Sequence, residues 1–279
     1  MIIHSTSLQG KRDSNEDQHL IFTNINNNDD NFTAINLFSI FDGHGGKDIS
    51  KYLSNNLHLY FTSKFNKFDM LNDNQKKKYI IKVYDHIESK LEKILKNKSF
   101  NIGSTSLSLI FYKLKGKTYY YVINVGDCRS VLCNNESIPI QLSKDHKPHM
   151  YDEKNRIEKL NGKIYFDGFD WRISDLSVSR AFGDMDAFPF VTHKPDIFKY
   201  KLKKNDKFFI LACDGLWDVI SNQDACNFVL EKIRDCGELT NIHGTSKKNI
   251  AQSLAEYAIK NGSTDNVSII IIFLMTDNI

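Results

Sequence analysis

The chain has 279 residues, of which 41% are hydrophobic, with 37 Lys and Arg against 34 Asp and Glu. Such a length and composition are typical of a soluble globular protein with a substantial core. The net charge of +3 provides no large basic surface for a phosphate backbone, so a nucleic-acid binder is not indicated.

The cysteines and the apolar stretches indicate the cellular environment. The five cysteines are an odd number without regular spacing, and residues 1–10 lack a charged segment followed by an apolar core. Reduced thiols, no secretory leader and a cytoplasmic or nuclear location are therefore expected. The most apolar stretch, Val267 to Met275, is far shorter than the roughly 20 residues that span a bilayer, so no membrane association is expected. No repeat or linker divides the sequence, and residues 1–279 are expected to form one domain.

The first half of the chain combines one long helical pattern with strand-like runs of β-branched and aromatic residues. An amphipathic helix is expected from Asp73 to Lys96. Its apolar stripe consists of Ile80, Val83, Ile87, Leu91 and Ile94. The expected strands are, in chain order, His19 to Thr23, Ala34 to Phe41, Ser106 to Tyr112, Tyr119 to Asn124 and Ser130 to Cys133. A polar hairpin loop is expected at Asn24 to Asn31, and short polar turns between most runs favour antiparallel pairing.

The second half of the chain predicts three more helices and two strands. The first helix is expected from about Met150 to Leu160, ending at Asn161 and Gly162. Ser221, followed three positions later by Asp224, resembles a capping box that opens a helix through Arg234. The remaining elements are a helix at Ser246 to Lys260, with Ile250, Leu254 and Ala258 on one stripe, and strands at Lys207 to Cys213 and Val267 to Leu274. Helix pairs between runs of strands, without strict alternation, predict an α+β fold and not a doubly wound parallel sheet.

Acidic residues lie at the ends of several predicted strands. Asp42 and Asp214 each follow an apolar strand, and Asp265 comes just before the last one. If the last strand runs antiparallel to the other two, its start lies at the same edge as their ends, and the three carboxylates converge there. Glu16 and Asp17, in the loop before the strand near His19, can join the same edge.

Converging carboxylates need a cation, because two like charges about 4 Å apart repel by roughly 4 kcal/mol at an effective dielectric near 20. Oxygen donors without a Cys and His set favour hard ions, so Mg²⁺ or Mn²⁺ is indicated over Zn²⁺. The glycines of Asp42-Gly43-His44-Gly45-Gly46 allow a sharp turn that brings a backbone carbonyl near a metal. A single Asp-Gly after a strand is usually a turn, and on periodicity alone a metal site and a set of turns remain equally good interpretations.

Other catalytic chemistries lack their motifs. No cysteine is followed six positions later by arginine, which excludes the phosphate-binding loop of cysteine-dependent phosphatases. Neither a GxSxG elbow nor a GxxxxGK[ST] loop is present, so an α/β-hydrolase and a P-loop nucleotidase are unsupported. His146 and His149 have no nearby Cys or third His that would complete a zinc site.

The segments around these acids resemble the metal-dependent protein serine/threonine phosphatases of type 2C. The resemblance runs from Ser7 to about Phe273. It depends on the number, order and spacing of several motifs, since any one of them is weak. These motifs are SLQGKRDSNED with Arg12, Glu16 and Asp17, FDGHGG (Phe41 to Gly46), GSTS (Gly103 to Ser106), NVGDCRS (Asn124 to Ser130), LSKDHKP (Leu142 to Pro148), LSVSRAFGD (Leu176 to Asp184), Lys194-Pro195-Asp196, LACDGLWDV (Leu211 to Val219) and TDNVSIIII (Thr264 to Ile272).

The resemblance implies a fold and a cofactor. The implied fold is a four-layer αββα sandwich, in which two antiparallel β-sheets are flanked by pairs of antiparallel helices. The implied cofactor is a pair of Mg²⁺ or Mn²⁺ ions per subunit at one edge of the sheets. The implied metal-site residues are Asp42, which bridges both ions, Asp214 and Asp265 for one ion, Glu16 and the Gly43 carbonyl for the other, Asp17 behind these ligands, and Asp127, which with Asp214 matches a weaker third site of some members.

The resemblance also implies hydrolysis of phosphoserine and phosphothreonine in phosphorylated proteins by a water that the metals activate, without a phosphoenzyme. Arg12 is implied to hold the phosphoryl oxygens. His44 is implied to protonate the departing alkoxide, with a purely supporting hydrogen bond as the alternative role. We expect a monomer. The segment Lys163 to Ser174 departs from the family pattern, which puts substrate specificity in doubt but not catalysis.

Two other functions remain open at the level of the sequence. A catalytically silent family member could act as a binding or scaffold protein, but such a protein could lose ligands, and none of the implied ligands is missing here. A metal-dependent hydrolase of small phosphates or nucleic acids is the other alternative. The nearly neutral net charge argues against a nucleic-acid substrate.

Overall fold

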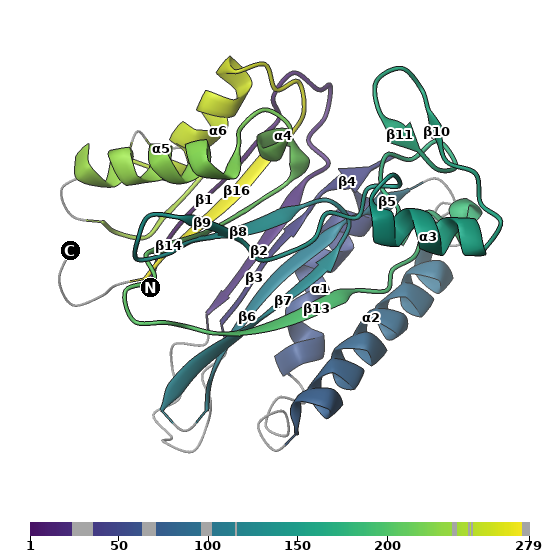
Figure 1. Ribbon diagram of the computed structural model, residues 1–279, viewed down its shortest axis with the longest axis horizontal. Coiled ribbons are helices and arrows are strands. Elements are labelled where there is room, and N and C mark those ends of the chain that lie inside the picture. The colour runs from purple at the N-terminus through teal and green to yellow at the C-terminus, as the bar shows by residue number, and fades with distance from the viewer. Residues whose placement is uncertain are drawn as a thin grey trace.

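The computed structural model describes residues 1–23, 36–62, 71–95, 102–114, 116–235, 239–244, 246 and 248–274. Within this part of the chain, two large β-sheets lie face to face with helices on both outer sides (Figure 1). The polar loop predicted at Asn24 to Asn31 lies outside the described residues. No helix among the described residues has the length and apolarity needed to cross a membrane.

The first large sheet is built around the last strand of the chain. Its order is β15 (Ile242–His243), β1 (Ile2–Leu8), β16 (Val267–Phe273), β14 (Phe208–Ala212), β8 (Arg129–Cys133) and β9 (Pro139–Gln141). Neighbouring strands are antiparallel except for β1 and β15, which pair in parallel with His4 opposite Ile242. This edge departs from the wholly antiparallel sheet that was predicted. A parallel pair needs a long connection, and more than 200 residues separate these two strands in the chain.

The second large sheet is antiparallel throughout. Its order is β13 (Asp196–Lys201), β7 (Lys117–Val125), β6 (Ser106–Leu114), β3 (Asn36–Phe41) and β2 (Gln18–Thr23). The strands predicted in both sheets are confirmed to within three residues at each end, whereas β1, β9, β13 and β15 were not predicted. Strands β9 and β15 have only three and two residues. Strands β1 and β13 carry several polar or charged residues, IIHSTSL and DIFKYK, which weakens the apolar pattern of a strand.

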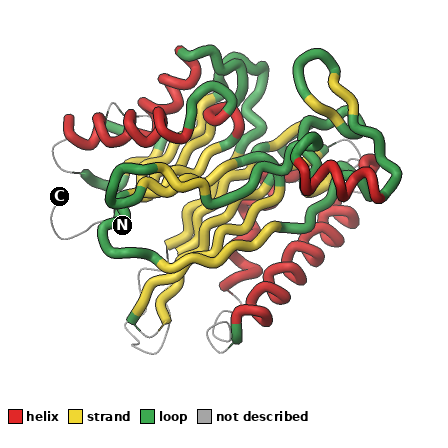
Figure 2. The backbone as a smooth tube through the Cα atoms, viewed as in Figure 1, coloured by secondary structure: helices red, strands yellow, loops and turns green. Residues whose placement is uncertain are grey.

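Helices cover the outer face of each sheet in pairs, which confirms the four-layer αββα sandwich (Figures 1 and 2). The second sheet is covered by α1 (Asp48–Thr62) and α2 (Asp73–Leu95), and the first by α5 (Asn222–Asp235) and α6 (Ile250–Lys260). Helix α1 was not predicted. Its buried residues Ile49, Leu53, Leu57 and Phe61 recur at every fourth position, a spacing that indicates an amphipathic helix.

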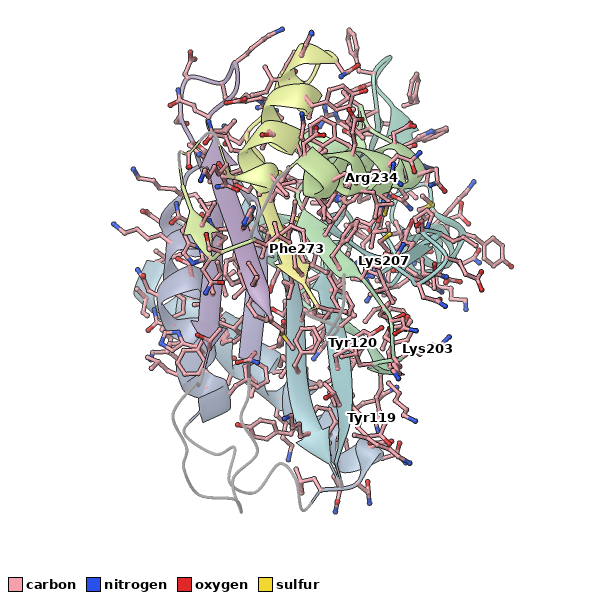
Figure 3. The ribbon with its side chains drawn as sticks, turned by 90° about the vertical axis from the view of Figure 1, so that its left-hand side faces the viewer. Tyr119, Tyr120, Lys203, Lys207, Arg234 and Phe273 are labelled. Atoms are coloured by element: carbon pink, nitrogen blue, oxygen red, sulfur yellow. The ribbon has the colours of Figure 1, made fainter. Side chains whose placement is uncertain are left out.

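The strands at the centre of each sheet are buried on both faces. In β16, Ile269 and Ile271 pack beneath the helices, while Ile270 and Ile272 pack between the sheets. Tyr120 of β7, labelled in Figure 3, also packs in the layer between the sheets. Burial on both faces explains why these strands have continuous apolar runs instead of alternating ones.

The helix ends follow the local sequence signals. The Asp224 N–H donates to Ser221 Oγ at 3.1 Å, which confirms the predicted capping box at α5. Helix α3 (Tyr151–Lys159) ends before Asn161, which has a φ of 63° as expected after a helix terminus. Helix α6 starts later than predicted, because the Asn249 side chain caps it at Ile250. In α2 the predicted stripe is buried except for Ile94, which is 52% exposed.

Smaller elements surround one end of the sandwich. A three-stranded sheet has the order β12 (Phe182–Gly183), β5 (Gly103–Ser104) and β4 (Gly43–His44). A hairpin of β10 (Tyr165–Phe166) and β11 (Trp171–Arg172) projects beside α3 (Figure 1). The hairpin lies within the segment Lys163 to Ser174, where the sequence departs from the pattern of type 2C phosphatases.

Candidate metal centre

The acidic residues at the strand ends converge on one cleft. Asp42 follows β3, Asp214 opens the short helix α4 (Asp214–Trp217) after β14, and Asp265 precedes β16. Strands β14 and β16 are antiparallel neighbours as predicted, but β3 belongs to the other sheet, so the site lies at an edge shared by both sheets. The cleft has a volume of about 610 Å³ and is lined by all predicted site residues except Asp17, namely Arg12, Glu16, Asp42, Gly43, His44, Asp127, Asp214 and Asp265.

Four carboxylates form the centre of this site, and we call them the acid cluster: Asp17, Asp42, Asp127 and Asp214. Among the described residues, oxygen atoms of Asp42, Asp127 and Asp214 lie within 4.8 Å of one another. Ligand atoms of Asp17, Asp42 and Cys213 form a second group within the same distance. Asp42 belongs to both groups, so it is the central carboxylate of the acid cluster.

Burial and mutual repulsion raise the pKa values of the acid cluster. Burial is the largest cause, and it raises the pKa of Asp17 to about 7 and that of Asp214 to about 6. The pKa values of Asp42 and Asp127 are also raised well above their usual range, first by burial and then by neighbouring carboxylates, among which Asp214 acts on both. Holding these carboxylates charged and close together costs free energy, and a bound cation would remove that cost.

Two oxygen atoms of the acid cluster lack hydrogen-bond partners in the described part of the chain. They are Oδ2 of Asp17 and Oδ2 of Asp127. The nearest cation to the second is Lys147, whose Nζ lies 3.7 Å from Asp127 Oδ2 and 3.4 Å from Asp218 Oδ1. Buried carboxylate oxygens without partners fit the all-oxygen coordination that Mg²⁺ and Mn²⁺ prefer.

Cys213 does not fit a ligand role although its sulfur lies near Asp17 and Asp42. Burial, followed by the charges of these two carboxylates, raises the pKa of the Cys213 thiol well above its usual value. Its Sγ accepts a hydrogen bond from the Ser268 N–H at 3.2 Å and donates to the Asn266 carbonyl at 3.4 Å. The thiol therefore supports the backbone behind the acid cluster.

Glu16 and Asp265 line the cleft but are not part of the two close groups. The Glu16 carboxylate accepts a hydrogen bond from the Gly46 N–H at 3.1 Å. Asp265 Oδ2 accepts from Arg12 Nη2 at 2.6 Å, and the Arg12 side chain is 59% exposed. The structure thus brings Arg12 to the same cleft as these carboxylates, with its guanidinium accessible to a ligand.

Close backbone contacts fix the loops that carry these side chains. A Cβ atom on Gly43 would lie 2.4 Å from the Glu16 carbonyl oxygen, so only glycine allows this approach. The Asp42 N–H donates to Thr105 Oγ1 at 3.0 Å, and the Thr105 N–H donates to the Asp42 carbonyl at 2.9 Å. Asn266 Oδ1 accepts from the Glu16 N–H at 2.9 Å. The sequence analysis gave Thr105 and Asn266 no role, although both lie inside the motifs GSTS and TDNVSIIII.

His44 has a buried partner that the sequence analysis did not assign. Its Nε2 lies 2.7 Å from Oδ2 of Asp184, whose side chain is only 2% exposed. Asp184 directly follows β12 and is the last residue of the motif LSVSRAFGD. Its place in this motif was the one feature of the sequence that pointed to a role at the site. Arg172, in strand β11 of the projecting hairpin, and Asp175, which follows the hairpin, also line the cleft. Neither was predicted as a site residue.

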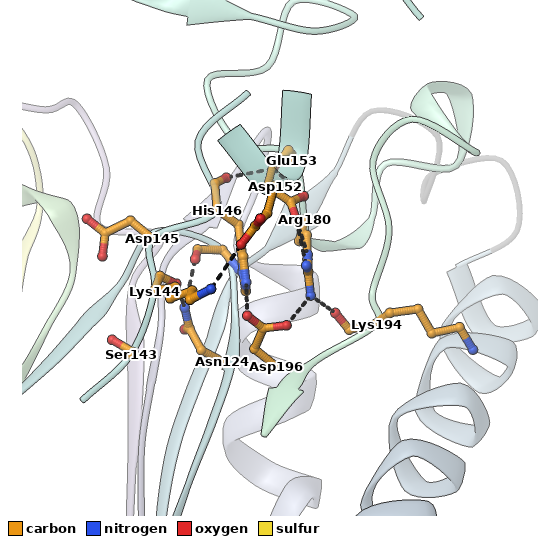
Figure 4. A network of polar contacts seen from close by, with 12 residues as sticks. Asn124, Ser143, Lys144, Asp145, His146, Asp152, Glu153, Arg180, Lys194 and Asp196 are labelled. Atoms are coloured by element: carbon orange, nitrogen blue, oxygen red, sulfur yellow. Dashed lines mark hydrogen bonds and ion pairs between the residues drawn. The ribbon is translucent and has the colours of Figure 1, made fainter. Parts of the chain in front are cut away.

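A second group of charged residues lies beside helix α3, and in this group opposite charges face each other (Figure 4). Arg180 donates to Glu153 Oε1 at 2.5 Å and to Asp196 Oδ1 at 2.9 Å. Although burial acts in the opposite direction, the hydrogen bonds and charge of Arg180 lower the pKa of Glu153 to about 2. We call this group the Glu153 network; its members are His146, Glu153, Arg156, Arg180 and Asp196. His146 belongs to this network and not to a zinc site, since its Nε2 is 3.3 Å from Asp196 Oδ2.

Comparison with known proteins gives consistent matches. A model of the protein phosphatase 2C family matches residues 2–267. A PP2C-like domain-containing protein of Acanthamoeba polyphaga mimivirus is 52% identical over 166 residues, which are 54% of this chain and 92% of the relative. The human integrin-linked kinase-associated serine/threonine phosphatase 2C is 33% identical over 289 residues, covering 95% of this chain and 70% of the relative.

Solved structures share the fold. Serine-threonine phosphatase 2C from Toxoplasma gondii superposes with a TM-score of 0.78 at 21% identity, covering 98% of this chain and 94% of that structure. A Caenorhabditis elegans sex determining protein superposes with a TM-score of 0.80 at 22% identity, covering 98% of this chain and 64% of that structure.

Proposed function

The chain belongs to the protein phosphatase 2C family, and from this membership we propose that it hydrolyses phosphoserine and phosphothreonine in proteins with the help of Mg²⁺ or Mn²⁺. The observation that carries the proposal is the acid cluster at the edge shared by both sheets. Its carboxylates lie close together, buried or half-buried, three of them line the cleft, and Lys147 is the cation of the described residues that approaches them within 4 Å. Such a site is suited to binding divalent cations next to a phosphate ester.

The donor set fits a pair of hard cations. All predicted side-chain ligands are carboxylates, and two buried oxygens of the acid cluster lack hydrogen-bond partners among the described residues. In the proposed assignment, Asp42 would be shared by two ions, Asp214 and Asp265 would hold one of them, Glu16 and the Gly43 carbonyl would hold the other, Asp17 would support them from behind, and Asp127 with Asp214 would hold a weaker third ion.

The residues of the chain divide the remaining work of the reaction. A pair of divalent cations supplies a nucleophile at neutral pH by lowering the pKa of a water, and it neutralises charge on the phosphoryl group. Arg12, exposed at the rim, orients the phosphoryl oxygens through its planar guanidinium. His44 delivers a proton to the departing Ser or Thr oxygen, a step worth about 10² to 10⁴ in rate.

Two alternatives are less well supported. A silent binding protein would not need a complete set of acids around an open cleft, yet all of them line it except Asp17, which lies behind. A hydrolase of small phosphates or nucleic acids would share the cations, but the net charge of +3 offers no broad basic surface for nucleic acid. We propose a monomer. The four described cysteines are free thiols, which suits the reducing cytoplasm or nucleus.

The proposal is tested by release of phosphate from a phosphothreonine peptide with Mn²⁺, with and without a chelator. We expect activity that disappears on chelation, returns with added metal and is lost in Asp214→Asn. Asp152→Asn is the matched control, because Asp152 is 65% exposed on α3 and does not line the cleft. Turnover that persists without metal would refute the proposal. Tight Mn²⁺ binding without turnover on any phosphopeptide would support the silent binding protein, and faster hydrolysis of nucleotides than of phosphopeptides would support the other hydrolase.

A further inference from the structure

The three-stranded sheet beside the cleft joins three segments that are far apart in the sequence. In its register, His44 of β4 and Gly183 of β12 lie on opposite sides of Gly103 of β5. Asp184, the residue after β12, reaches across Gly103 to His44. A Cβ atom on Gly103 would lie 2.1 Å from Asp184 Oδ2 and 2.2 Å from His44 Nε2, so the pair can form only because this position has no side chain.

The two partners differ in burial. The Asp184 side chain is 2% exposed, whereas that of His44 is 28% exposed and borders the cleft. Asp184 is absent from the described lining of the cleft, so it contacts the imidazole from behind. A carboxylate can only accept a hydrogen bond, so the proton of the contact belongs to His44 Nε2. The second ring nitrogen, Nδ1, is then the one available to a leaving oxygen.

The backbone that presents Asp184 is held by a buried acid of α2. Gly183 and Asp184 have φ angles of 82° and 47°, in the left-handed region, which is unfavourable for a non-glycine residue unless its surroundings hold it. The Gly183 N–H donates to the Glu88 carboxylate, with oxygens at 3.2 Å and 3.3 Å. The Asp184 N–H donates to the Ile102 carbonyl at 3.1 Å. On its other side, Glu88 Oε1 lies 3.7 Å from His193 Nδ1.

From this geometry we infer that Asp184 is the positioning residue for His44 and that Glu88 positions Asp184 through the Gly183 N–H. The inference rests on the proposed function, since it assigns these residues to the same reaction. In that reaction the bond from phosphorus to the Ser or Thr oxygen breaks as a bond to the water oxygen forms. His44 gives the leaving oxygen the Nδ1 proton of its imidazolium form, while the Nε2 proton stays in the hydrogen bond to Asp184, and Nδ1 then regains a proton from solvent. Asp184 keeps the imidazole in the orientation that this transfer needs.

A positioning role predicts a loss that depends on the leaving group. A Ser or Thr alkoxide is strongly basic and needs the proton, whereas the leaving group of p-nitrophenyl phosphate departs without one. We expect Asp184→Asn to lower kcat on a phosphothreonine peptide about 100-fold, at the lower end of general-acid contributions, with KM nearly unchanged. On p-nitrophenyl phosphate the same variant should lose less than about threefold. Asp186→Asn is the matched control, because Asp186 is exposed two residues further along the chain and should leave both activities unchanged.

Two further variants separate positioning from general damage. In a His44→Ala background, Asp184→Asn should cause no additional loss on the peptide, because the two residues act as one unit. Glu88→Ala should cause a smaller loss confined to the peptide, and Glu88→Gln should recover most of it, since the amide oxygen still accepts from the Gly183 N–H. Equal losses on both substrates, or additive losses in the double variant, would overturn the inference.

A measurement on the metal-free protein keeps this test independent of turnover. Nitrogen NMR of His44 should show a hydrogen-bonded Nε2–H in the wild-type protein, and the loss of this hydrogen bond or a change of tautomer in Asp184→Asn. An unchanged His44 signal in Asp184→Asn contradicts the inference even if the enzyme is active. A wild-type protein that shows this signature but hydrolyses neither substrate contradicts the proposed function and leaves the contact between Asp184 and His44 established.

Discussion

The acid cluster and the Glu153 network are two groups of buried carboxylates in the same protein with opposite electrostatics. In the Glu153 network, Arg180 lies between Glu153 and Asp196. Although burial opposes this, Arg180 lowers the pKa of Glu153, and His146 together with Arg180 lowers the pKa of Asp196. In the acid cluster, carboxylates face one another, and burial with mutual repulsion raises their pKa values. Carboxylates are therefore paired with cationic side chains in the Glu153 network and left largely without such partners in the acid cluster.

This difference separates structural carboxylates from functional ones. A buried ion pair keeps its charges because each partner replaces part of the lost hydration of the other. Carboxylates gathered without such partners destabilise the fold, and a protein retains them where a bound cation or a reaction needs them. The comparison predicts that neutralising one carboxyl has opposite effects on stability in the two groups.

The largest expected effect is the loss of activity when the acid cluster is neutralised. Asp42→Asn removes the carboxylate common to both close groups, and we expect hydrolysis of a phosphothreonine peptide to fall by roughly 10³-fold or more. Since Asp42 is also repelled by Asp17 and Asp214, we expect the metal-free variant to unfold at a higher temperature than the metal-free wild type. Calorimetry with and without Mn²⁺ measures this, and a lower unfolding temperature in the metal-free variant would break the comparison.

The next effect is the opposite one in the Glu153 network. Glu153→Gln takes the nearer of its two carboxylates from Arg180, whose side chain is 12% exposed, and leaves it paired with Asp196 alone. We expect the free energy of unfolding to fall by about 3 kcal/mol, as for other broken buried pairs, with Mn²⁺ affinity unchanged. Urea denaturation measures the loss. Glu158→Gln is the control on the same helix, because Glu158 is 55% exposed and its pair with Lys154 spans 3.8 Å. A loss in the control as large as in Glu153→Gln would mean that the loss does not come from the buried pair.

These two groups were not equally accessible from the sequence. The positions of Asp214 and Asp265 next to apolar strands predicted that they meet at one sheet edge, because antiparallel neighbours bring the end of one strand to the start of the next. Asp42 also reaches the cleft, but from the other sheet, which the strand pattern did not show. The Glu153 network was not predicted, because its partners come from three separate segments and meet only through side chains. Glu153 and Arg180 are 27 residues apart, and Arg180 and Asp196 are 16 apart. No local spacing rule connects such positions.

The fold shows a similar division. Continuous apolar strands such as β14 and β16 were predicted almost to the residue, because burial on both faces leaves an unbroken apolar run. Helix α1 was missed, although its buried residues recur at every fourth position, because Ser, Asn and Tyr dilute the pattern. The pairing of Asp184 with His44 was missed because it depends on Gly103 of a third segment, whose contribution is the absence of a side chain.

The pH dependence of stability offers a third way to test the comparison. Asp17 has a folded pKa of about 7, above the usual value of 3.8, so folding favours its protonated form. Its contribution is fully present below about pH 4 and is lost as the pH rises to 7, so metal-free Asp17→Asn should gain roughly 2 kcal/mol relative to wild type between pH 5 and 8. Glu153, with a folded pKa of about 2, has the opposite sign: its contribution is present above about pH 4.5 and is lost as the pH falls toward 2.

Urea denaturation of the wild type, Asp17→Asn and Glu153→Gln at several pH values measures how the free energy of unfolding of each protein changes with pH. Titrating groups shared by all three proteins, such as the histidines, cancel in each comparison with wild type. Added Mn²⁺ should remove the loss of stability that the wild type shows toward pH 8, because the cation pairs the carboxylates. If the stability of Asp17→Asn and that of Glu153→Gln, each relative to wild type, changed with pH in the same direction, the acid cluster and the Glu153 network would not differ in the way that their pKa shifts indicate.

The smallest effect concerns Lys147, a cation of the chain that touches the acid cluster. Its Nζ lies 3.7 Å from Asp127, and its pKa is raised by Asp127, Asp218 and Asp214 although burial opposes this. Lys147 therefore neutralises part of the charge at the proposed third site and competes there with a metal. We expect Lys147→Gln to strengthen Mn²⁺ binding at that site about three- to tenfold, close to 1 kcal/mol, by calorimetric titration. The effect stays small because Asp218 shares the charge of Lys147.

Lys144→Gln is the control, since Lys144 is 61% exposed and pairs with Asp152 outside the cleft. Weaker binding in Lys147→Gln would mean that Lys147 supports the site, and the acid cluster would then resemble the Glu153 network more closely than its raised pKa values indicate.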